Sequence, residues 1–196
     1  MMATKDQKSL PVKKVGLLLF YRIGTVLYAL LQRRGLFHFA GGKVQTWPGM
    51  CQVTAEGKME FGETDTDTLR REVCEELGED FFKEISSFLP PEHVLFQNKG
   101  VTTYGLVVRP QIIRYITLES QSGGLVPIQD ENLIKLLSSH GDQTYRDYMA
   151  NHSHPMAFHE AFLAVEEGFR IWGDYKLNHR LLYPWGEPAS SAGSAV

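Results

Sequence analysis

Three glutamates, Glu72, Glu75 and Glu76, are spaced at i, i+3 and i+4 within a segment whose pattern predicts one helix over Thr64–Leu77. On a helix this spacing puts all three carboxylates on one face within a turn. Most glutamate runs form solvated surface, but these occupy the last two turns, where the helix dipole disfavours each exposed negative charge by about 0.3–1 kcal/mol. A bound hard cation would offset this penalty. Since all three ligands are oxygen donors, they favour Mg²⁺ or Mn²⁺ over zinc.

The same helix needs a surface against which to pack. Thr66, Leu69, Val73 and Leu77 form a stripe beside the acidic face, and we expect this stripe to lie on a sheet. Thr64 followed by Asp67 predicts a capping box, and Gly78 is a natural stop. Strands are expected before the helix, and they fall at Val12–Arg22, Thr25–Arg33 and Met50–Ala55.

The rest of the pattern predicts an α/β fold, a layered domain with a mixed β-sheet and an additional C-terminal helix. Further strands are expected around Val94–Gln97, Thr102–Val108 and Ile112–Leu118, and further helices near Glu131–Ser139 and over Pro155–Trp172. We expect residues 1–11 to be flexible, residues 12–186 to form a single domain, and the Pro-, Ser-, Ala- and Gly-rich residues 187–196 to be disordered.

Composition excludes several classes of protein. A chain of 196 residues with 43% apolar and 22% charged residues is typical of one globular domain. A net charge of −3 disfavours a nucleic-acid polymer as partner, and no apolar run is long enough to span a membrane. The two cysteines, Cys51 and Cys74, match no zinc or disulfide spacing and predict a reducing, cytoplasmic location.

The segment from Gly57 to Glu79 reads GKMEFGETDTDTLRREVCEELGE and resembles the signature of the Nudix hydrolase superfamily. The matching residues are Gly57, Glu63, Arg71, Glu72, Val73, Glu75, Glu76 and Gly78. Two positions depart from the pattern: Glu79 replaces a final aliphatic residue, and Glu56 replaces a glycine that usually precedes Gly57. The resemblance implies a Nudix-like α/β/α sandwich.

The resemblance also implies roles for these residues. Glu72, Glu75 and Glu76, with the Gly57 carbonyl, would ligate one to three Mg²⁺ or Mn²⁺ ions, and Arg71 would hold the carboxylates with support from Glu63. The ions would bridge phosphate oxygens and activate a water that attacks phosphorus. The chain would therefore be a pyrophosphohydrolase that cleaves a small substrate, a nucleoside diphosphate linked to another moiety. The general base stays open among Glu75, Glu76, Glu119, Asp130 and Glu131.

Two other groups of residues are weaker candidates. In the loop Gly35–Gly49, Lys43 and Trp47 either contact substrate or pack the loop, and Glu56 either alters substrate fit or adds an acidic ligand. The histidines His152, His154 and His159 cluster in the sequence, but no metal motif accompanies them, and we interpret them as surface and N-capping residues.

Alternative functions remain. The run TWPGMCQVTAEGKMEFGE is similar to the isopentenyl-diphosphate isomerase branch of the superfamily, although that enzyme's active-site cysteine motif and His-rich metal site are missing. A catalytically silent nucleotide sensor on the same fold is a second alternative, and the intact Arg71-Glu72 and Glu75-Glu76 pairs disfavour it. The aromatic stripe from Phe158 to Trp172 predicts a core-facing helix, with a homodimer face as the other interpretation.

Overall fold

The central strand of the sheet is β1 (Lys14–Ile23) in the computed structural model, which describes residues 13–38, 43–129, 136–139, 146 and 154–173. The first half of β1 pairs antiparallel with β6 (Ala55–Lys58), and the second half pairs antiparallel with β2 (Val26–Arg34). Along its other edge, β1 runs parallel to β8 (Val101–Val108). The sheet is therefore mixed, as the sequence predicts.

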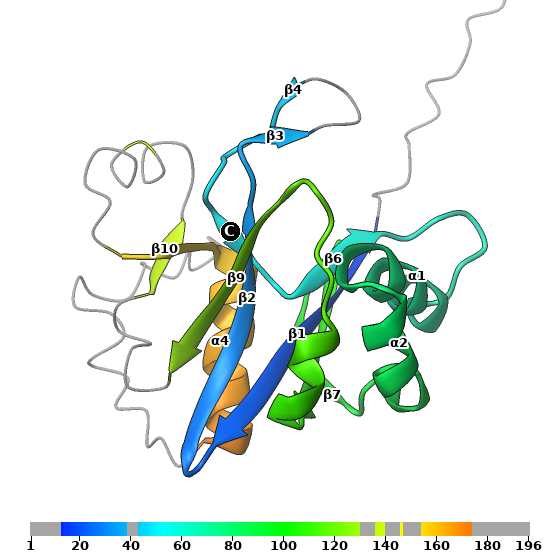
Figure 1. The fold of residues 1–196 in the computed structure, drawn as a ribbon. Coiled ribbons are helices and arrows are strands. Elements are labelled where there is room, and N and C mark those ends of the chain that lie inside the picture. Colours follow the sequence, from blue (N-terminus) through cyan, green and yellow to red (C-terminus); the bar gives the residue numbers. More distant parts are fainter. Residues whose placement is uncertain (1–12, 39–42, 130–135, 140–145, 147–153, 174–196) are drawn as a thin grey trace, which may run out of the picture.

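The sheet continues outward from this centre in the order β10-β11-β5-β2-β1-β8-β7, with β9 also paired to β2. A separate small hairpin, β3 with β4, stands above the sheet in Figure 1. The remaining strands are β3 (Phe37–His38), β4 (Lys43–Val44), β5 (Cys51–Gln52), β7 (His93–Gln97), β9 (Ser122–Gln129), β10 (Leu137–Ser139) and β11 (Met156–Phe158).

Alternating side chains of β1 and β2 divide the core into two clusters, one on each face of the sheet. On one face Phe20 and its neighbours pack against α4 (His159–Trp172), and the Phe20 and Phe169 rings meet edge to face at 5.7 Å. On the other face lie α1 (Asp65–Leu77) and α2 (Glu79–Ile85). Figure 1 shows these helices on opposite sides of the sheet, which confirms the α/β sandwich and its C-terminal helix.

Helix α1 begins as its sequence predicts. The Thr64 hydroxyl accepts from the Asp67 backbone N–H at 3.3 Å, and the Asp67 carboxylate accepts from the Thr64 N–H at 3.0 Å, which completes the capping box. Leu69, Val73 and Leu77 are fully buried against the sheet. This packing fixes the rotation of α1 about its axis, and with it the direction of the neighbouring acidic face.

Several predicted elements differ from the structure. The expected strand Ile112–Leu118 is wrong, because a 3-10 helix, η3 (Pro110–Tyr115), begins with a proline and takes up the apolar run. Another short 3-10 helix, η2 (Ser86–Phe88), follows α2. The sequence pattern does not predict strand β9 (Ser122–Gln129), since Gly123, Gly124 and Pro127 are poor strand formers.

Near the C-terminus the predicted helix boundaries also shift. Residues 137–139 form strand β10 rather than the end of a helix, while residues 131–135 lie outside the described residues. Helix α4 begins at His159, because Met156–Phe158 pair in the sheet as β11. The predicted flexible segment 1–11 and tail 187–196 also lie outside the described residues.

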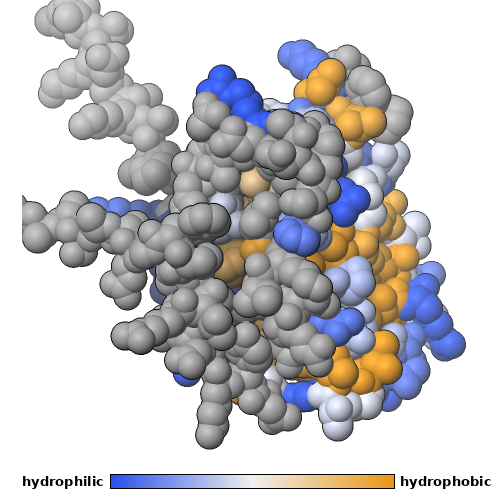
Figure 2. Space-filling view, turned by 90° about the vertical axis from the view of Figure 1, so that its left-hand side faces the viewer, coloured by the Kyte–Doolittle hydropathy of each residue, from blue (hydrophilic) through white to orange (hydrophobic). Residues whose placement is uncertain are grey.

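The exposed apolar side chains of the described residues are scattered over separate elements. On the face shown in Figure 2, orange apolar residues are interspersed with blue hydrophilic ones. The largest exposed examples are Ile23, Leu36, Val44, Phe61, Phe88, Val94, Val107 and Tyr115. None of the helices described here is long and apolar enough to cross a membrane.

Candidate active site

Arg71 is the centre of a charged network at the start of the acidic face of α1. Its Nε and Nη2 donate to the two oxygens of Glu63 at 2.8 and 3.0 Å, a bidentate pair, and Nη2 also donates to the Lys58 carbonyl at 2.8 Å. The Nη1 atom donates to Glu72 and lies 3.4 Å from Glu75. Hydrogen bonds from Arg71 lower the pKa of Glu63 to about 2. Arg71 thus links the loop before α1 to two of its carboxylates.

Gly57 lies directly against the carboxylate of Glu72. A Cβ added at Gly57 would stand 1.6 Å from Glu72 Oε1, so no larger residue fits unless Glu72 moves. Burial raises the pKa of Glu72, although the hydrogen bond from Arg71 opposes this shift. Strand β6 and helix α1 are therefore in close contact at the position where the sequence predicts a metal ion.

Glu76 lies one turn further along α1 and is partly buried. Burial raises its pKa to about 8, and the nearby charges of Glu72, Glu119 and Glu56 act in the same direction. The Glu56 backbone N–H donates to Glu76 Oε2 at 3.1 Å, while the Glu56 side chain pairs with Lys14 Nζ at 2.6 Å. A carboxylate in these surroundings gains stability from any added positive charge.

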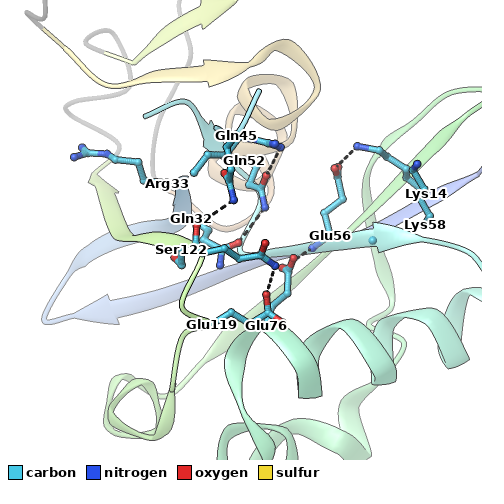
Figure 3. Close-up of a pocket in the computed structure, with 13 residues that line it drawn as sticks. Lys14, Gln32, Arg33, Gln45, Gln52, Glu56, Lys58, Glu76, Glu119 and Ser122 are labelled. Carbon is cyan, nitrogen blue, oxygen red and sulfur yellow. Dashed lines mark hydrogen bonds and ion pairs between the residues drawn. The ribbon is translucent and has the colours of Figure 1, made fainter. Parts of the chain in front are cut away.

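A cavity of about 450 Å³ opens beside Glu76. We call the side formed by Glu56, Gly57, Glu76 and Glu119 its acidic end; Lys14 and Lys58 flank it. Figure 3 shows Glu76 and Glu119 side by side at this end, with the Lys14–Glu56 pair next to them.

The other side of the cavity is rich in side-chain amides, and we call it the amide end. It consists of Gln32, Gln45, Gln52 and Gln121 together with Arg34. Gln52 Nε2 donates to Gln32 Oε1 at 3.0 Å, Gln45 Nε2 donates to the Gln121 carbonyl at 3.2 Å, and Gln121 donates to Glu119. The bond from Gln121 to Glu119 connects the two ends.

The donor set of the acidic end suits a hard divalent cation, because every side-chain donor is a carboxylate oxygen. The nearby charges of Glu72, Glu119 and Glu56 repel the Glu76 carboxylate, and a bound cation would relieve this repulsion. In the described part of the chain, no three His, Cys, Asp or Glu side chains converge to enclose an ion. Arg71 lies against Glu72 and Glu75 instead, so these two carboxylates are paired within the protein.

Other candidates from the sequence lie elsewhere. Lys43 is exposed on β4, and Trp47 stacks on Phe158 with ring centroids 5.5 Å apart; neither is among the described residues that line the cavity. His154 is exposed, and His159 Nδ1 lies 3.0 Å from the Ser138 hydroxyl. His152, Asp130 and Glu131 lie outside the described residues, whereas Glu119 is at the acidic end.

Sequence reasoning missed the amide end. Its residues come from β2, the loop after β4, β5 and the position just before β9, and no motif joins them. One signal was present: the apolar strand β2 ends in the polar run Gln32, Arg33, Arg34. Polar residues at the end of a buried strand often line a site at the edge of a sheet.

Comparison with known proteins gives a family. The family model described as NUDIX domain matches residues 11–140 of this chain. No curated protein sequence matches it significantly.

Several solved structures resemble the fold distantly. A MutT/nudix family protein from Enterococcus faecalis has 15% identity and a TM-score of 0.49, with 94% of this chain and 70% of that chain covered. An Ap4A hydrolase from C. elegans has 16% identity and a TM-score of 0.45, covering 82% and 98%. The NUDIX domain of Shewanella oneidensis NrtR, complexed with ADP ribose, has 15% identity and a TM-score of 0.46, covering 82% and 88%. At these values the likenesses carry no argument about substrate.

The family match rests on more than the signature, since it extends over most of the sheet and over α1 and α2. Enzymes of this family generally use divalent metal ions. Because the NUDIX model spans well over half of the 196 residues, the chain belongs to the NUDIX family, and the enzyme class expected from its sequence, a Nudix pyrophosphohydrolase, follows from that membership.

Proposed function

We propose that this protein is a Mg²⁺- or Mn²⁺-dependent hydrolase of a nucleoside diphosphate linked to another moiety. The observation that carries this proposal is the close approach of Gly57 to the Glu72 carboxylate, next to Glu76 at the acidic end of the cavity. A buried cluster of like charges is costly without a cation, and a diphosphate needs the same cation to approach carboxylates.

The metal ligands in this proposal are Glu72, Glu75 and Glu76 with the Gly57 carbonyl. When bound, the ion would supply charge neutralisation for the diphosphate and a lowered pKa for a water. Arg71 and Glu63 act as positioning residues, since their bidentate pair fixes the loop before α1 and one side of Glu72. Lys14 and Lys58 flank the acidic end and supply positive charge toward a phosphate.

The general base is a carboxylate that faces the cavity without contacting Arg71. Glu76 and Glu119 fit this description among the described residues, because both line the cavity and neither is hydrogen-bonded or ion-paired to Arg71 there. Glu75 is over half exposed and lies against Arg71, which disfavours it as the base. We therefore propose Glu76 or Glu119 for this role.

The isomerase alternative is disfavoured by the lining of the cavity. Its described lining residues are all polar or glycine, whereas a hydrocarbon chain favours a lining of hydrophobic side chains. Neither Cys51 nor Cys74 is among them, and burial raises the pKa of Cys51, which makes its thiol a poor nucleophile. Both cysteines are free, which supports the proposed cytoplasmic location.

A screen of diphosphate compounds with Mg²⁺ and with Mn²⁺ tests this proposal. Released phosphate is detected after coupling to a phosphatase, and each reaction is repeated in excess EDTA. We expect turnover of at least one nucleoside diphosphate derivative that EDTA abolishes. Turnover that persists in EDTA would refute the metal assignment, and binding of nucleotides without any turnover would favour the silent sensor.

A further inference from the structure

The outer edge of the sheet carries a second cavity, of about 380 Å³, beside the start of β7. In contrast to the cavity beside Glu76, its described lining is mainly apolar, and we call it the edge groove. The apolar lining side chains are Phe88, Pro90, Pro91, Leu106, Val107 and Trp172. Phe88 is 61% exposed and Val107 is 40% exposed. A groove with this much uncovered apolar surface favours an apolar occupant.

The edge groove lies where strand β8 continues past its neighbour β7. The last residue pair between these two strands is Gly105 with His93, whereas residues 106–108 of β8 pair only with β1 on the opposite side. On the β7 side, residues 106–108 have no strand partner in the part of the chain that the structure describes. An open strand edge beside an apolar groove suits an extended peptide segment, which can use both backbone hydrogen bonds and side-chain burial.

Helix α4 ends at this groove. The Trp172 ring meets the His93 ring edge to face at 5.2 Å, and Gly105 leaves room for it, since an added Cβ would stand 2.6 Å from Trp172 Cη2. Gly173 then stops the helix: its N–H donates to the Phe169 carbonyl at 2.8 Å, and its backbone is extended, with φ −84° and ψ 160°. The chain therefore leaves α4 beside the edge groove in an extended conformation.

The sequence that follows Gly173 has the composition of a segment that binds an apolar surface. Residues 174–185 read DYKLNHRLLYPW, and six of these twelve are Leu, Tyr or Trp, whereas residues 186–196 contain none of the three. Segments that stay unfolded are poor in such residues, because they cannot bury enough apolar area to offset the loss of entropy. Charge agrees as well, since Glu92 lines the groove and the segment carries Lys176 and Arg180.

We propose that residues 181–185 of the same chain bind the edge groove, with Leu181, Leu182 and Trp185 as the side chains that enter it. The seven residues between Gly173 and Leu181 can span at most about 25 Å, which is ample for a segment that starts beside the groove. A short linker gives the segment an effective concentration of about a millimolar. This advantage favours the chain's own segment over a second copy or a free peptide of the same chemistry.

Hydrogen–deuterium exchange of the 196-residue chain, followed on peptides that cover residues 181–185, tests this proposal. In the wild-type protein these amides should exchange about tenfold or more slowly than in the same peptide free in solution. Val107→Asp places a charge in the groove and should bring exchange to within about twofold of the free peptide. Val44→Asp is the matched control on β4, where Val44 is 67% exposed and outside the lining of the groove, and it should keep the protection. Unprotected amides in the wild-type protein, or protection that survives Val107→Asp, overturn the proposal.

A second variant and a dilution series decide the remaining cases. Phe88→Asp should release the segment in the same way, and since Phe88 is exposed on η2, this change decides the question if Val107→Asp does not fold. Protection should stay constant over about a hundredfold dilution of the protein, because binding within one chain does not depend on concentration. Protection that disappears on dilution assigns the groove to a second copy and overturns the proposal. None of these measurements uses turnover, so their outcome is independent of the proposed function.

Discussion

The two ends of the cavity differ in how the chain builds them. The acidic end comes largely from one helix and the strand before it, with Glu56, Gly57 and Glu76 inside 21 consecutive residues. The amide end is assembled from β2, β5, the loop after β4 and the residue just before β9, which lie far apart in the sequence. A local segment thus provides the carboxylates proposed to bind metal, and long-range strand pairing assembles the opposite wall of the cavity.

The largest effect is expected at the acidic end, from Glu75→Gln. The substitution keeps side-chain size and removes a charge that metal binding requires, so hydrolysis should fall by about a thousandfold or more. Glu75 is over half exposed, and its ion pair with Arg71 is long, at 3.4 Å, and therefore weak. The melting temperature without metal should therefore change little. Glu79→Gln, exposed and beyond α1, is the control for rate constants measured at saturating Mg²⁺. Wild-type turnover in Glu75→Gln would refute the ligand assignment.

A smaller loss is expected from Gly57→Ala. The added methyl group would collide with Glu72, so the carboxylate must turn away from β6. Displacing one ligand should reduce kcat by roughly 10- to 100-fold and raise the Mg²⁺ concentration needed for half activity. Gly100→Ala is the matched control, because its added Cβ would meet only Asn98 Oδ1, at 3.9 Å. Unchanged metal dependence in Gly57→Ala would show that Glu72 is not a ligand.

These two predictions concern residues that the sequence identifies, and the reason is physical. A helix fixes the relation of residues three and four apart, so Glu72, Glu75 and Glu76 could be placed on one face before any fold was known. The capping box at Thr64 and the buried stripe of Leu69 and Val73 followed from equally local rules. The mixed sheet followed from the alternation of strands and helices.

The sequence does not predict the amide end, because the formation of this end depends on the register between strands. Gln52 reaches Gln32 only because β5 pairs with β2 in that register. Gly35 allows the chain to approach the residue before β9, since a Cβ added at Gly35 would stand 2.4 Å from the Gln121 carbonyl oxygen. Strand β9 itself was missed, since tertiary pairing overrides the low strand propensity of its glycines. Contacts of this range carry no periodic signal in a single sequence.

A moderate effect is therefore expected at the amide end from Gln52→Met. The substitution removes the donor to Gln32 and the acceptor for Arg34 while keeping the side-chain volume. We expect KM for a confirmed substrate to rise by about five- to tenfold with kcat nearly unchanged, because the chemistry is proposed to occur at the other end. Steady-state kinetics separate the two constants. A loss confined to kcat would contradict the division between the ends.

The smallest effect concerns stability and pH. Hydrogen bonds from Arg71 hold the pKa of Glu63 at about 2, below its ordinary value of 4.5. A depressed carboxyl pKa stabilises the fold above the unfolded pKa, and this contribution is lost as pH falls from about 4.5 toward 2. Glu63→Gln should therefore melt slightly lower than wild type at pH 7, and the difference should shrink on acidification. A difference in melting temperature between the two proteins that grows as pH falls from 5 to 3 would contradict this role of Glu63.

The central claim is that the carboxylates of α1 hold the metal on which turnover depends. The most direct measurement is the change in melting temperature on adding Mg²⁺ to wild type, to Glu76→Gln and to the control Glu79→Gln, with hydrolysis of one confirmed substrate measured in parallel. Since a ligand that binds only the folded state stabilises it, Mg²⁺ should raise the melting temperature of wild type and control. It should leave Glu76→Gln nearly unchanged, and that variant should lose turnover. Equal stabilisation of all three proteins, with turnover retained in Glu76→Gln, would place the metal elsewhere and contradict the account.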